Sequence, residues 1–282
     1  MLTLAHATLN IGDKRLLDDV NIKVKPGECV VLVGPNGAGK STALKAMCGD
    51  IKLTKGSVQL NGRGLSNYKP QELAKLRAVM CQSYELTFPF NAKEVVTMGG
   101  YAFAEHHSKK ALDNYANKAM AQLEVCHLTD KCFTQLSGGE QQRVQLARVL
   151  SQLFPALDLV KSGQGASPYL LIDEPTSSLD LYHQYQVMAQ AKFAASQGAG
   201  VIAVVHDLSL AATFADKVYM LEKGKIVRQG SPVQVFSRST LKQTYRVAAQ
   251  VSTMENYLPF LLIEHSHGQV PNAAFIPNAL IS

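Results

Sequence analysis

The chain has 282 residues, 46% of them hydrophobic and 18% charged, with a formal net charge of +6. These are values of a globular protein, and no apolar run approaches the roughly 20 residues of a membrane helix, so no membrane-spanning helix is predicted. The positive charge suits either nucleic acid or anionic lipid headgroups. Because the sequence has no long Lys/Arg block and no aromatic-basic interleaving, no nucleic-acid partner is predicted.

The first residues and the cysteines bear on location. Residues 1–6 lack a basic segment followed by an apolar core, so no signal peptide is indicated and a cytosolic protein is expected. No two cysteines form C-x-x-C, so neither a zinc site nor a disulfide framework is indicated. The five cysteines are expected to be core thiols in a reducing compartment: Cys29, Cys48, Cys81, Cys126 and Cys132.

Short strands are expected at the start of the chain. Residues 2–9 and 20–24 have strand character and are joined by a turn at 12–14. A Pro-Gly turn then leads into residues 29–33, whose uninterrupted apolar run is typical of a buried parallel strand.

A glycine-rich loop follows this strand directly and matches the phosphate-binding pattern G-x-x-x-x-G-K-[ST] without a mismatch. A helix is predicted over 42–48, so the motif has the strand, loop and helix that it requires. The glycines let backbone N–H groups surround a polyphosphate, and the helix N-terminus adds its positive dipole end. Lys40 can reach the β- and γ-phosphates, and the Ser41 hydroxyl can ligate Mg²⁺. The predicted phosphate-binding residues are Gly34, Pro35, Asn36, Gly37, Ala38, Gly39, Lys40, Ser41 and Thr42.

The middle of the chain changes character. Strands at 57–60 and 77–80 flank a helix at 70–75. From 84 to about 149 strand signals vanish and helical periodicity appears, as in 111–123 and 140–150. This stretch is predicted to be a helical subdomain inserted into a nucleotide-binding fold.

Strands and helices then alternate to the end of the predicted domain. The expected strands are 169–172, 201–205, 217–221 and 225–227, and the expected helices are 182–195 and 208–215. This alternation predicts an α/β fold with a mostly parallel sheet and helices on both faces. Residues 1–250 are expected to form a single domain. Residues 251–282 are expected to be a C-terminal extension, partly disordered over 269–282.

Two carboxylates end the apolar strand near residue 170. Asp173 at the strand end can hold the hydration shell of Mg²⁺ near Ser41, and Glu174 beside it can orient or deprotonate an attacking water. A buried strand capped by surface acids is the alternative, and the phosphate-binding loop upstream argues against it.

Residues 136–142, Leu-Ser-Gly-Gly-Glu-Gln-Gln, form a third motif. Ser137 is a predicted helix N-cap, with Glu140 completing a capping box, and a capped glycine-rich helix start is also an anion site. Here the chain resembles the ATP-binding cassette (ABC) ATPases, whose signature motif this heptapeptide matches. The resemblance covers roughly 2–230. It implies a P-loop NTPase fold of the ABC ATPase type, with a mostly parallel core sheet, an N-terminal antiparallel β portion and an inserted helical subdomain.

The resemblance assigns further residues. Gln82 matches the family's Q-loop glutamine, which senses the γ-phosphate through Mg²⁺ and water. Residues 178–180, Ser-Leu-Asp, match the D-loop, so Asp180 is expected at the nucleotide. His206 matches the switch histidine at the γ-phosphate. Ile11 occupies the position where the family stacks an aromatic ring on adenine, so acceptance of GTP stays open.

The resemblance also implies how the site is assembled. The chain has one copy of each motif, so it is expected to act as a homodimer with two ATP molecules and Mg²⁺ at the interface. Glu174, His206 and Gln82 would be catalytic in it, and Ser41, Gln82 and Asp173 would hold the metal. Donors to the γ-phosphate bound by the partner copy's Lys40 would be Ser137, Gly138 and Gly139.

A cassette ATPase without membrane spans requires separate permease subunits. Residues 84–99 resemble the iron-complex, haem and cobalamin importer branch, in which Phe-Pro-Phe and Val-Val-x-Met-Gly recur. This segment is expected to contact two polytopic permease subunits, with a periplasmic substrate-binding protein as an indirect partner. An internally packed loop is the alternative.

Two features narrow the branch to haem importers. Residues 179–184 resemble the region that follows their D-loop, and 154–168 resemble an extension that they carry before the catalytic strand. The extension alone is equally a tolerated surface insertion. The prediction is the ATPase of a hemin importer on the cytoplasmic face of the inner membrane. The alternatives are import of a ferric siderophore or cobalamin, and a non-transport cassette protein.

Overall fold

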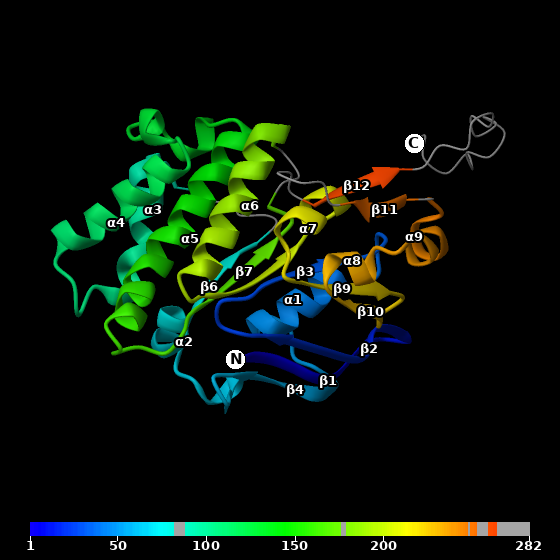
Figure 1. Ribbon diagram of the computed structural model, residues 1–282. Coiled ribbons are helices and arrows are strands. Elements are labelled where there is room, and N and C mark those ends of the chain that lie inside the picture. The colour runs from blue at the N-terminus through cyan, green and yellow to red at the C-terminus, as the bar shows by residue number, and fades with distance from the viewer. Residues whose placement is uncertain (82–87, 176–178, 248, 253–258, 264–282) are drawn as a thin grey trace.

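A six-stranded, mostly parallel sheet forms the centre of the molecule (Figure 1). The computed structural model describes residues 1–81, 88–175, 179–247, 249–252 and 259–263. The strand order is β10-β9-β3-β8-β7-β6, and only the β9–β10 pair of this sheet is antiparallel. The strands are β3 (Cys29–Val33), β6 (Arg77–Met80), β7 (Tyr169–Asp173), β8 (Gly200–Val204), β9 (Lys217–Glu222) and β10 (Lys225–Gly230).

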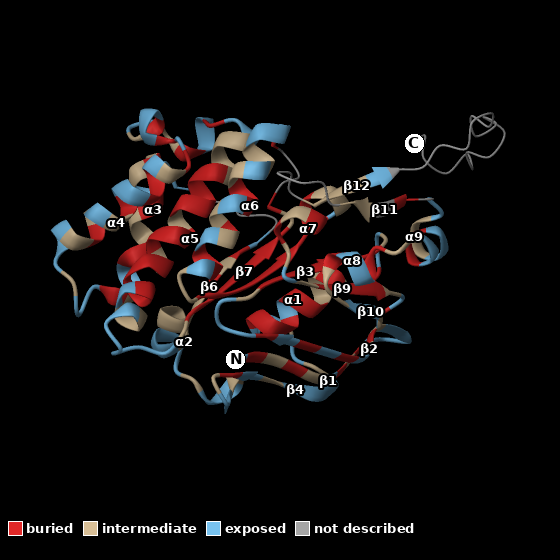
Figure 2. Cartoon of the chain, viewed as in Figure 1, coloured by how far each residue is buried: buried red, intermediate tan, exposed pale blue. Residues whose placement is uncertain are grey.

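A second, antiparallel sheet lies beside the first, in the order β2-β1-β4-β5. It comprises β1 (Leu2–Ile11), β2 (Lys14–Val24), β4 (Lys55–Leu60) and β5 (Arg63–Gly64). Helix α1 (Lys40–Cys48) lies between the two sheets, and Figure 2 shows that much of it is buried. Apolar residues of both sheets and of α1 form one core cluster, which fixes the start of α1 against β3.

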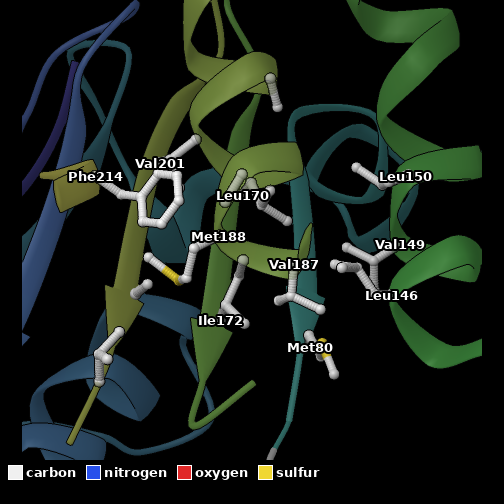
Figure 3. Close-up of a cluster of buried hydrophobic side chains, with 14 of the residues drawn as sticks. Met80, Leu146, Val149, Leu150, Leu170, Ile172, Val187, Met188, Val201 and Phe214 are labelled. Atoms are coloured by element: carbon white, nitrogen blue, oxygen red, sulfur yellow. The ribbon is translucent and has the colours of Figure 1, made fainter. Parts of the chain in front are cut away.

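The opposite face of the parallel sheet is covered by α5 (Gly138–Lys161), α6 (Leu181–Ser196) and α7 (Leu208–Phe214). Figure 3 shows this core, in which Met188 of α6 lies near Ile172 of β7 and Leu146 and Leu150 of α5 belong to the same cluster. The strands β3, β7 and β8 are buried along their whole length, as expected for parallel strands covered on both faces. The predicted α/β fold, with a mostly parallel core sheet, an N-terminal antiparallel portion and a helical region, is confirmed.

Helices fill the part of the chain between β6 and β7. After η1 (Leu65–Asn67) and α2 (Pro70–Leu76) come α3 (Ala92–Met98), η2 (Gly99–Phe103), α4 (Lys109–Gln122), η3 (Cys126–Leu128), η4 (Phe133–Gln135) and α5. Between 88 and 168 the described chain has no strand, only an isolated bridge between Asn91 and Cys132. The helical character expected here therefore holds, and residues 84–87 lie outside the described part.

The alternative interpretation of 154–168 as a surface insertion does not hold for its first part. Helix α5 continues through it to Lys161, and Phe154 and Leu157 are buried. The ammonium of Lys118 lies 4.5 Å from the centroid of the Phe154 ring. The hydroxyl of Tyr115 in α4 donates a 2.7 Å hydrogen bond to Asp158. These contacts make residues 154–158 part of the packing between α4 and α5.

The chain after β10 is more ordered than its sequence indicates. Helices α8 (Pro232–Val235) and α9 (Arg238–Tyr245) precede an antiparallel pair, β11 (Ala249–Ser252) and β12 (Phe260–Ile263). The hydroxyl of Thr213 in α7 donates to the Pro259 carbonyl at 2.9 Å, which ties this pair to the parallel-sheet core. The disorder expected for 269–282 concerns residues outside the described part.

The cysteines only partly match the expectation of core thiols. All five are free, but just Cys29 and Cys48 are buried, whereas Cys81 and Cys126 are exposed and Cys132 is half-buried. Burial raises the pKa of the Cys29 and Cys48 thiols to about 12. Among the described helices, none combines the length and apolarity needed to cross a bilayer.

Candidate nucleotide site

The glycine-rich loop connects the buried end of β3 to the start of α1. Gly34 has φ 149°, and a Cβ placed there would lie 2.1 Å from the carbonyl oxygen of Leu221 in β9. Gly39 is the N-cap of α1 and has φ 101°. Both positions therefore require glycine, and the loop that they shape leads directly into the N-terminus of α1.

Lys40 is the first residue of α1 and is buried. Its Nζ donates hydrogen bonds to the carbonyls of Gly34, at 2.8 Å, and Pro35, at 3.1 Å. Burial lowers the pKa of the Lys40 ammonium, and the carboxylates of Glu174 and Asp173 oppose this shift. The cation is thus held over the loop by carbonyl dipoles, where a phosphate oxygen is a stronger partner.

Ser41 and Asp173 meet at the carboxyl end of the parallel sheet. The Ser41 hydroxyl donates a 2.9 Å hydrogen bond to Oδ1 of Asp173, the last residue of β7. Asp173 is only 3% exposed, and its Oδ2 is buried without a hydrogen-bond partner. Burial raises the pKa of this carboxyl, and the bond from Ser41 opposes the shift.

This oxygen pair suits a hard divalent cation. Mg²⁺ binds through one or two carboxylates and hydroxyls together with substrate phosphates, and it needs an oxygen that no other group already uses. The unpartnered Oδ2 of Asp173 provides that oxygen. Ser41 and Asp173 would hold the ion, which would supply neutralisation of phosphate charge.

Glu174 and His206 stand opposite each other at the ends of neighbouring strands. Oε1 of Glu174 lies 2.7 Å from Nε2 of His206. The Glu174 amide donates to the carbonyl of Val204 at 3.2 Å, and Glu174 has φ 49°, in the left-handed region. A carboxylate beside an imidazole can hold a water and accept its proton.

A cavity of about 640 Å³ connects these groups. Of the predicted residues, it is lined by Asn36, Gly37, Ala38, Gly39, Lys40, Ser41, Thr42, Glu174 and His206. Lys14 and Leu16 of β2 also line it, and sequence reasoning missed both. Ile11 does not line the cavity, although it is 60% exposed at the turn that precedes β2.

The signature residues lie elsewhere on the chain. Ser137 caps α5 as predicted: its amide and hydroxyl both donate to Oε2 of Glu140 at 2.8 Å. Ser137 and Gly138 are exposed, Gly139 is half-buried, and these three residues do not line the cavity of their own P-loop. A capped glycine-rich helix start is thus presented outward.

Asp180 does not line the cavity. It is the N-cap of α6, and its Oδ1 accepts a 2.9 Å bond from the His183 amide and lies 2.8 Å from Nδ1 of His183. The bond from the His183 amide lowers the pKa of Asp180. Gln82 and Ser178 lie outside the described residues.

One contact with the loop comes from a distant part of the chain. The phenol of Tyr245, the last residue of α9, lies near the backbone of Gly34. Burial raises the pKa of this phenol to about 12, and the Gly34 backbone opposes the rise. Nothing in the local sequence of α9 indicates this contact.

Comparison with known proteins decides the family. The model of the family described as "ABC transporter" matches residues 17–177, which contain the P-loop, the signature and the Asp173–Glu174 pair. The chain belongs to the ABC transporter family.

The relatives of this ABC transporter ATPase cover nearly its whole length. The "hemin import ATP-binding protein HmuV" of Pseudoalteromonas translucida is 54% identical over 251 residues, which is 89% of this chain and 94% of that protein. The dimeric structure of the ATP-binding cassette MJ0796 with ADP and Pi is 27% identical and has TM-score 0.70, covering 82% of this chain and 99% of that one.

A further solved structure supports the fold alone. It is the inward-facing conformation of a putative metal-chelate type ABC transporter, with 22% identity and TM-score 0.72. The match covers 94% of this chain and 97% of that one. The cassette architecture thus extends over the chain well beyond the family match at 17–177.

Proposed function

We propose that this chain is the ATP-hydrolysing subunit of an importer that carries hemin across the inner membrane. The observation that carries the substrate is the 54% identity to a hemin import ATP-binding protein over 94% of that protein's length. Import of a ferric siderophore or cobalamin by the same machine is the alternative, because the ATPase itself does not select the transported molecule.

The site residues have distinct proposed roles. Lys40 and the loop amides bind the β- and γ-phosphates, while Ser41 and Asp173, with Gln82, hold Mg²⁺. Glu174 accepts the proton of the attacking water. His206, whose Nε2 lies 2.7 Å from the Glu174 carboxylate, orients that carboxylate and contacts the γ-phosphate. Ile11 and Asp180 stay proposed nucleotide contacts, although neither lines the cavity in the single chain.

Two copies of the chain complete the site. The outward position of Ser137, Gly138 and Gly139, away from their own cavity, supports a role at the ATP of a second copy. The dimeric state of the similar cassette MJ0796 also supports this arrangement. ATP binding would close the two copies together, and hydrolysis would release them.

The permease is proposed to dock on residues 84–99, whose described part begins at 88. Phe88 is 67% exposed and lies 6.2 Å from the ring of Phe90, which packs on the core. An exposed phenylalanine beside a partly buried one that packs on the core is a suitable contact for a partner helix. Two permease subunits would hold the ATPase dimer at the cytoplasmic face, with the periplasmic binding protein beyond them.

The domain organisation follows the same proposal. Residues 1–250 would form one ATPase domain with 84–149 as its inserted helical subdomain, and 251–282 would be a C-terminal extension. The β11–β12 pair begins at Ala249, across the proposed boundary.

Growth on defined iron sources tests the substrate. Deletion of the gene is expected to abolish growth on hemin as sole iron source and to spare growth on ferric siderophores. A plasmid copy of the wild type should restore growth, and a Lys40→Ala copy should not. Loss of siderophore use with intact growth on hemin would refute the substrate and leave the ATPase untouched.

A further inference from the structure

The backbone of Glu174 is held in a conformation that few side chains adopt. Its φ of 49° lies in the left-handed region, which is unfavourable for a residue other than glycine. Such a conformation persists where surrounding contacts over-determine it. Hydrogen bonds at both ends of the residue hold the Glu174 main chain: its amide donates to the carbonyl of Val204, and its carbonyl accepts from Nε2 of Gln142, each at 3.2 Å.

Gln142 belongs to the helix that begins with the signature motif. It lies five residues beyond Ser137, within the first turns of α5, and its side chain is partly buried. It therefore joins the helix that carries Ser137, Gly138 and Gly139 to the carboxylate at the end of β7 in the same chain.

The contact belongs to a row of donors along α5. Farther along the helix, Arg148 donates to the carbonyl of Val79 at 3.4 Å. Gln152 donates to the carbonyls of Ala74, at 2.7 Å, and Arg77, at 3.1 Å. Gln142, Arg148 and Gln152 share one side of the helix, since their angular positions at 100° per residue fall within about a third of a turn. Gln142 is the member of this row that lies at the catalytic end of the sheet.

We propose that Gln142 is a positioning residue for Glu174, and that it links the signature helix of each copy to the catalytic glutamate of that same copy. This inference rests on the proposed ATPase function. Without the donor, the Glu174 carbonyl loses this hydrogen bond and the left-handed backbone can relax. The carboxylate then leaves the orientation in which it lies 2.7 Å from His206. Nucleotide binding by Lys40 and the loop does not use this contact.

The first test separates positioning from packing. Gln142→Met keeps the length of the side chain and removes the N–H donor, and Gln142→Glu keeps its shape but replaces the donor amide with a charged carboxylate that repels the Glu174 carbonyl. Gln152→Met is the matched control, because Gln152 donates to carbonyls from the same side of α5 at a distance from the cavity. Steady-state hydrolysis of Mg²⁺-ATP and the thermal midpoint are measured for the purified full chain.

Both Gln142 variants are expected to lower kcat about ten- to a hundredfold, as for an ångström-scale misplacement of a catalytic group, with KM for ATP within about twofold of wild type. Gln152→Met should keep the wild-type kcat, and its thermal midpoint should be similar to that of Gln142→Met. An unchanged kcat in the Gln142 variants would overturn the inference, as would a loss of kcat that Gln152→Met reproduces. A wild type that does not hydrolyse ATP would instead refute the proposed function.

A mixed dimer tests the link within one copy. Two differently tagged copies are combined, one of which carries Lys40→Ala so that only the other copy's P-loop site works. Gln142→Met placed on the copy with the intact P-loop should slow hydrolysis at least about tenfold more than the same change on the Lys40→Ala copy. Equal rates, or the reverse order, would show that Gln142 acts through the signature on the partner's nucleotide and would overturn the inference.

Discussion

Nε2 of His206 lies 2.7 Å from Oε1 of Glu174, although 32 residues separate the two in the chain. The parallel pairing of β7 with β8 brings them together, because both residues follow the carboxyl ends of these strands. Both side chains line the same cavity as Lys40 and Ser41. The pair therefore faces the position where the terminal phosphate of a nucleotide held by the P-loop would lie.

Replacement of Glu174 by Gln should leave ATP binding intact and slow hydrolysis by about a hundredfold or more, as for loss of a general base. ATP should then hold two copies together, because closure no longer leads to cleavage. Gel filtration with and without ATP measures the dimer, and phosphate release measures turnover. A variant that stays monomeric with ATP and hydrolyses at the wild-type rate would contradict the role of Glu174.

Replacement of His206 by Ala should lower kcat by about tenfold or more and change ATP affinity little, because Lys40 and the loop remain. The double variant with Glu174→Gln should be no slower than Glu174→Gln alone, since the two residues act as one unit. Single-turnover hydrolysis measures these rates. If the losses in rate from His206→Ala and Glu174→Gln were additive in the double variant, the two residues would act independently, contrary to this prediction.

Replacement of Lys40 by Ala should weaken Mg²⁺-ATP binding roughly ten- to a hundredfold, because a hydrogen bond to a charged group contributes about 1.5–3 kcal/mol. Hydrolysis should fall to background. Lys55→Ala, at an exposed position of β4, is the matched control and should bind ATP normally. Calorimetric titration gives both affinities, and near-wild-type binding by Lys40→Ala would refute its role at the phosphates.

Asp173 gives the nucleotide-free chain a specific dependence on pH. Its pKa is raised in the folded state by burial, so the folded chain binds this proton more tightly than the unfolded chain. That contribution to stability is fully present below the unfolded value of 3.8 and is lost as pH rises through the raised folded value. Asp173→Asn should therefore melt a few degrees higher than wild type at neutral pH.

The difference in melting temperature should shrink as pH falls through the raised folded pKa of Asp173, below which the wild-type carboxyl is protonated as well. Saturating Mg²⁺ should raise the melting temperature of the wild type and not that of Asp173→Asn. Scanning calorimetry in metal-free buffer and with Mg²⁺ measures both effects. A pH-independent difference would show that burial of the charge is not the cause.

Phe154 should matter for stability rather than for the chemistry. Its ring is buried where α5 packs on α4, so Phe154→Ala should cost about 3–5 kcal/mol in the free energy of unfolding. Gln164→Ala, at an exposed position beyond the end of α5, should change it by less than about 0.5 kcal/mol. Urea unfolding measures both free energies. Equal effects of the two substitutions would show that residues 154–158 do not contribute to the packing between α4 and α5.

Local patterns were sufficient to predict the elements of the core and the side chains that meet around the P-loop. Asp173, Glu174 and His206 each follow a strongly apolar strand, and parallel strands gather such residues at one edge of a sheet. The strand order was not accessible in this way. β3 lies between β8 and β9 because of pairing between residues far apart in the chain, which no local pattern contains.

The features that the sequence did not predict also depend on tertiary packing. Lys14 and Leu16 reach the cavity because the N-terminal sheet packs beside α1, and neither residue has a motif. The predicted helix ended at residue 150, although the apolar spacing of Leu153, Phe154 and Leu157 is helical; α5 continues to Lys161 with Pro155, a residue unfavourable in a helix interior, inside it. The bond between Gln142 and Glu174 depends on where α5 crosses the sheet, which is a property of tertiary packing.

The contact between the Tyr245 phenol and the Gly34 backbone limits how far this chain can be shortened. The carbonyl of Gly34 also receives the Lys40 ammonium at 2.8 Å, so contacts lie at both the amide and the carbonyl of this residue. A minimal fragment ended at Gly230, after the last strand of the parallel sheet, would retain the P-loop, signature and catalytic carboxylates. It would also leave that amide without its phenol and uncover the side of the core on which α9 packs. A protein engineer who trims or fuses the C-terminus of this chain should place the junction beyond α9.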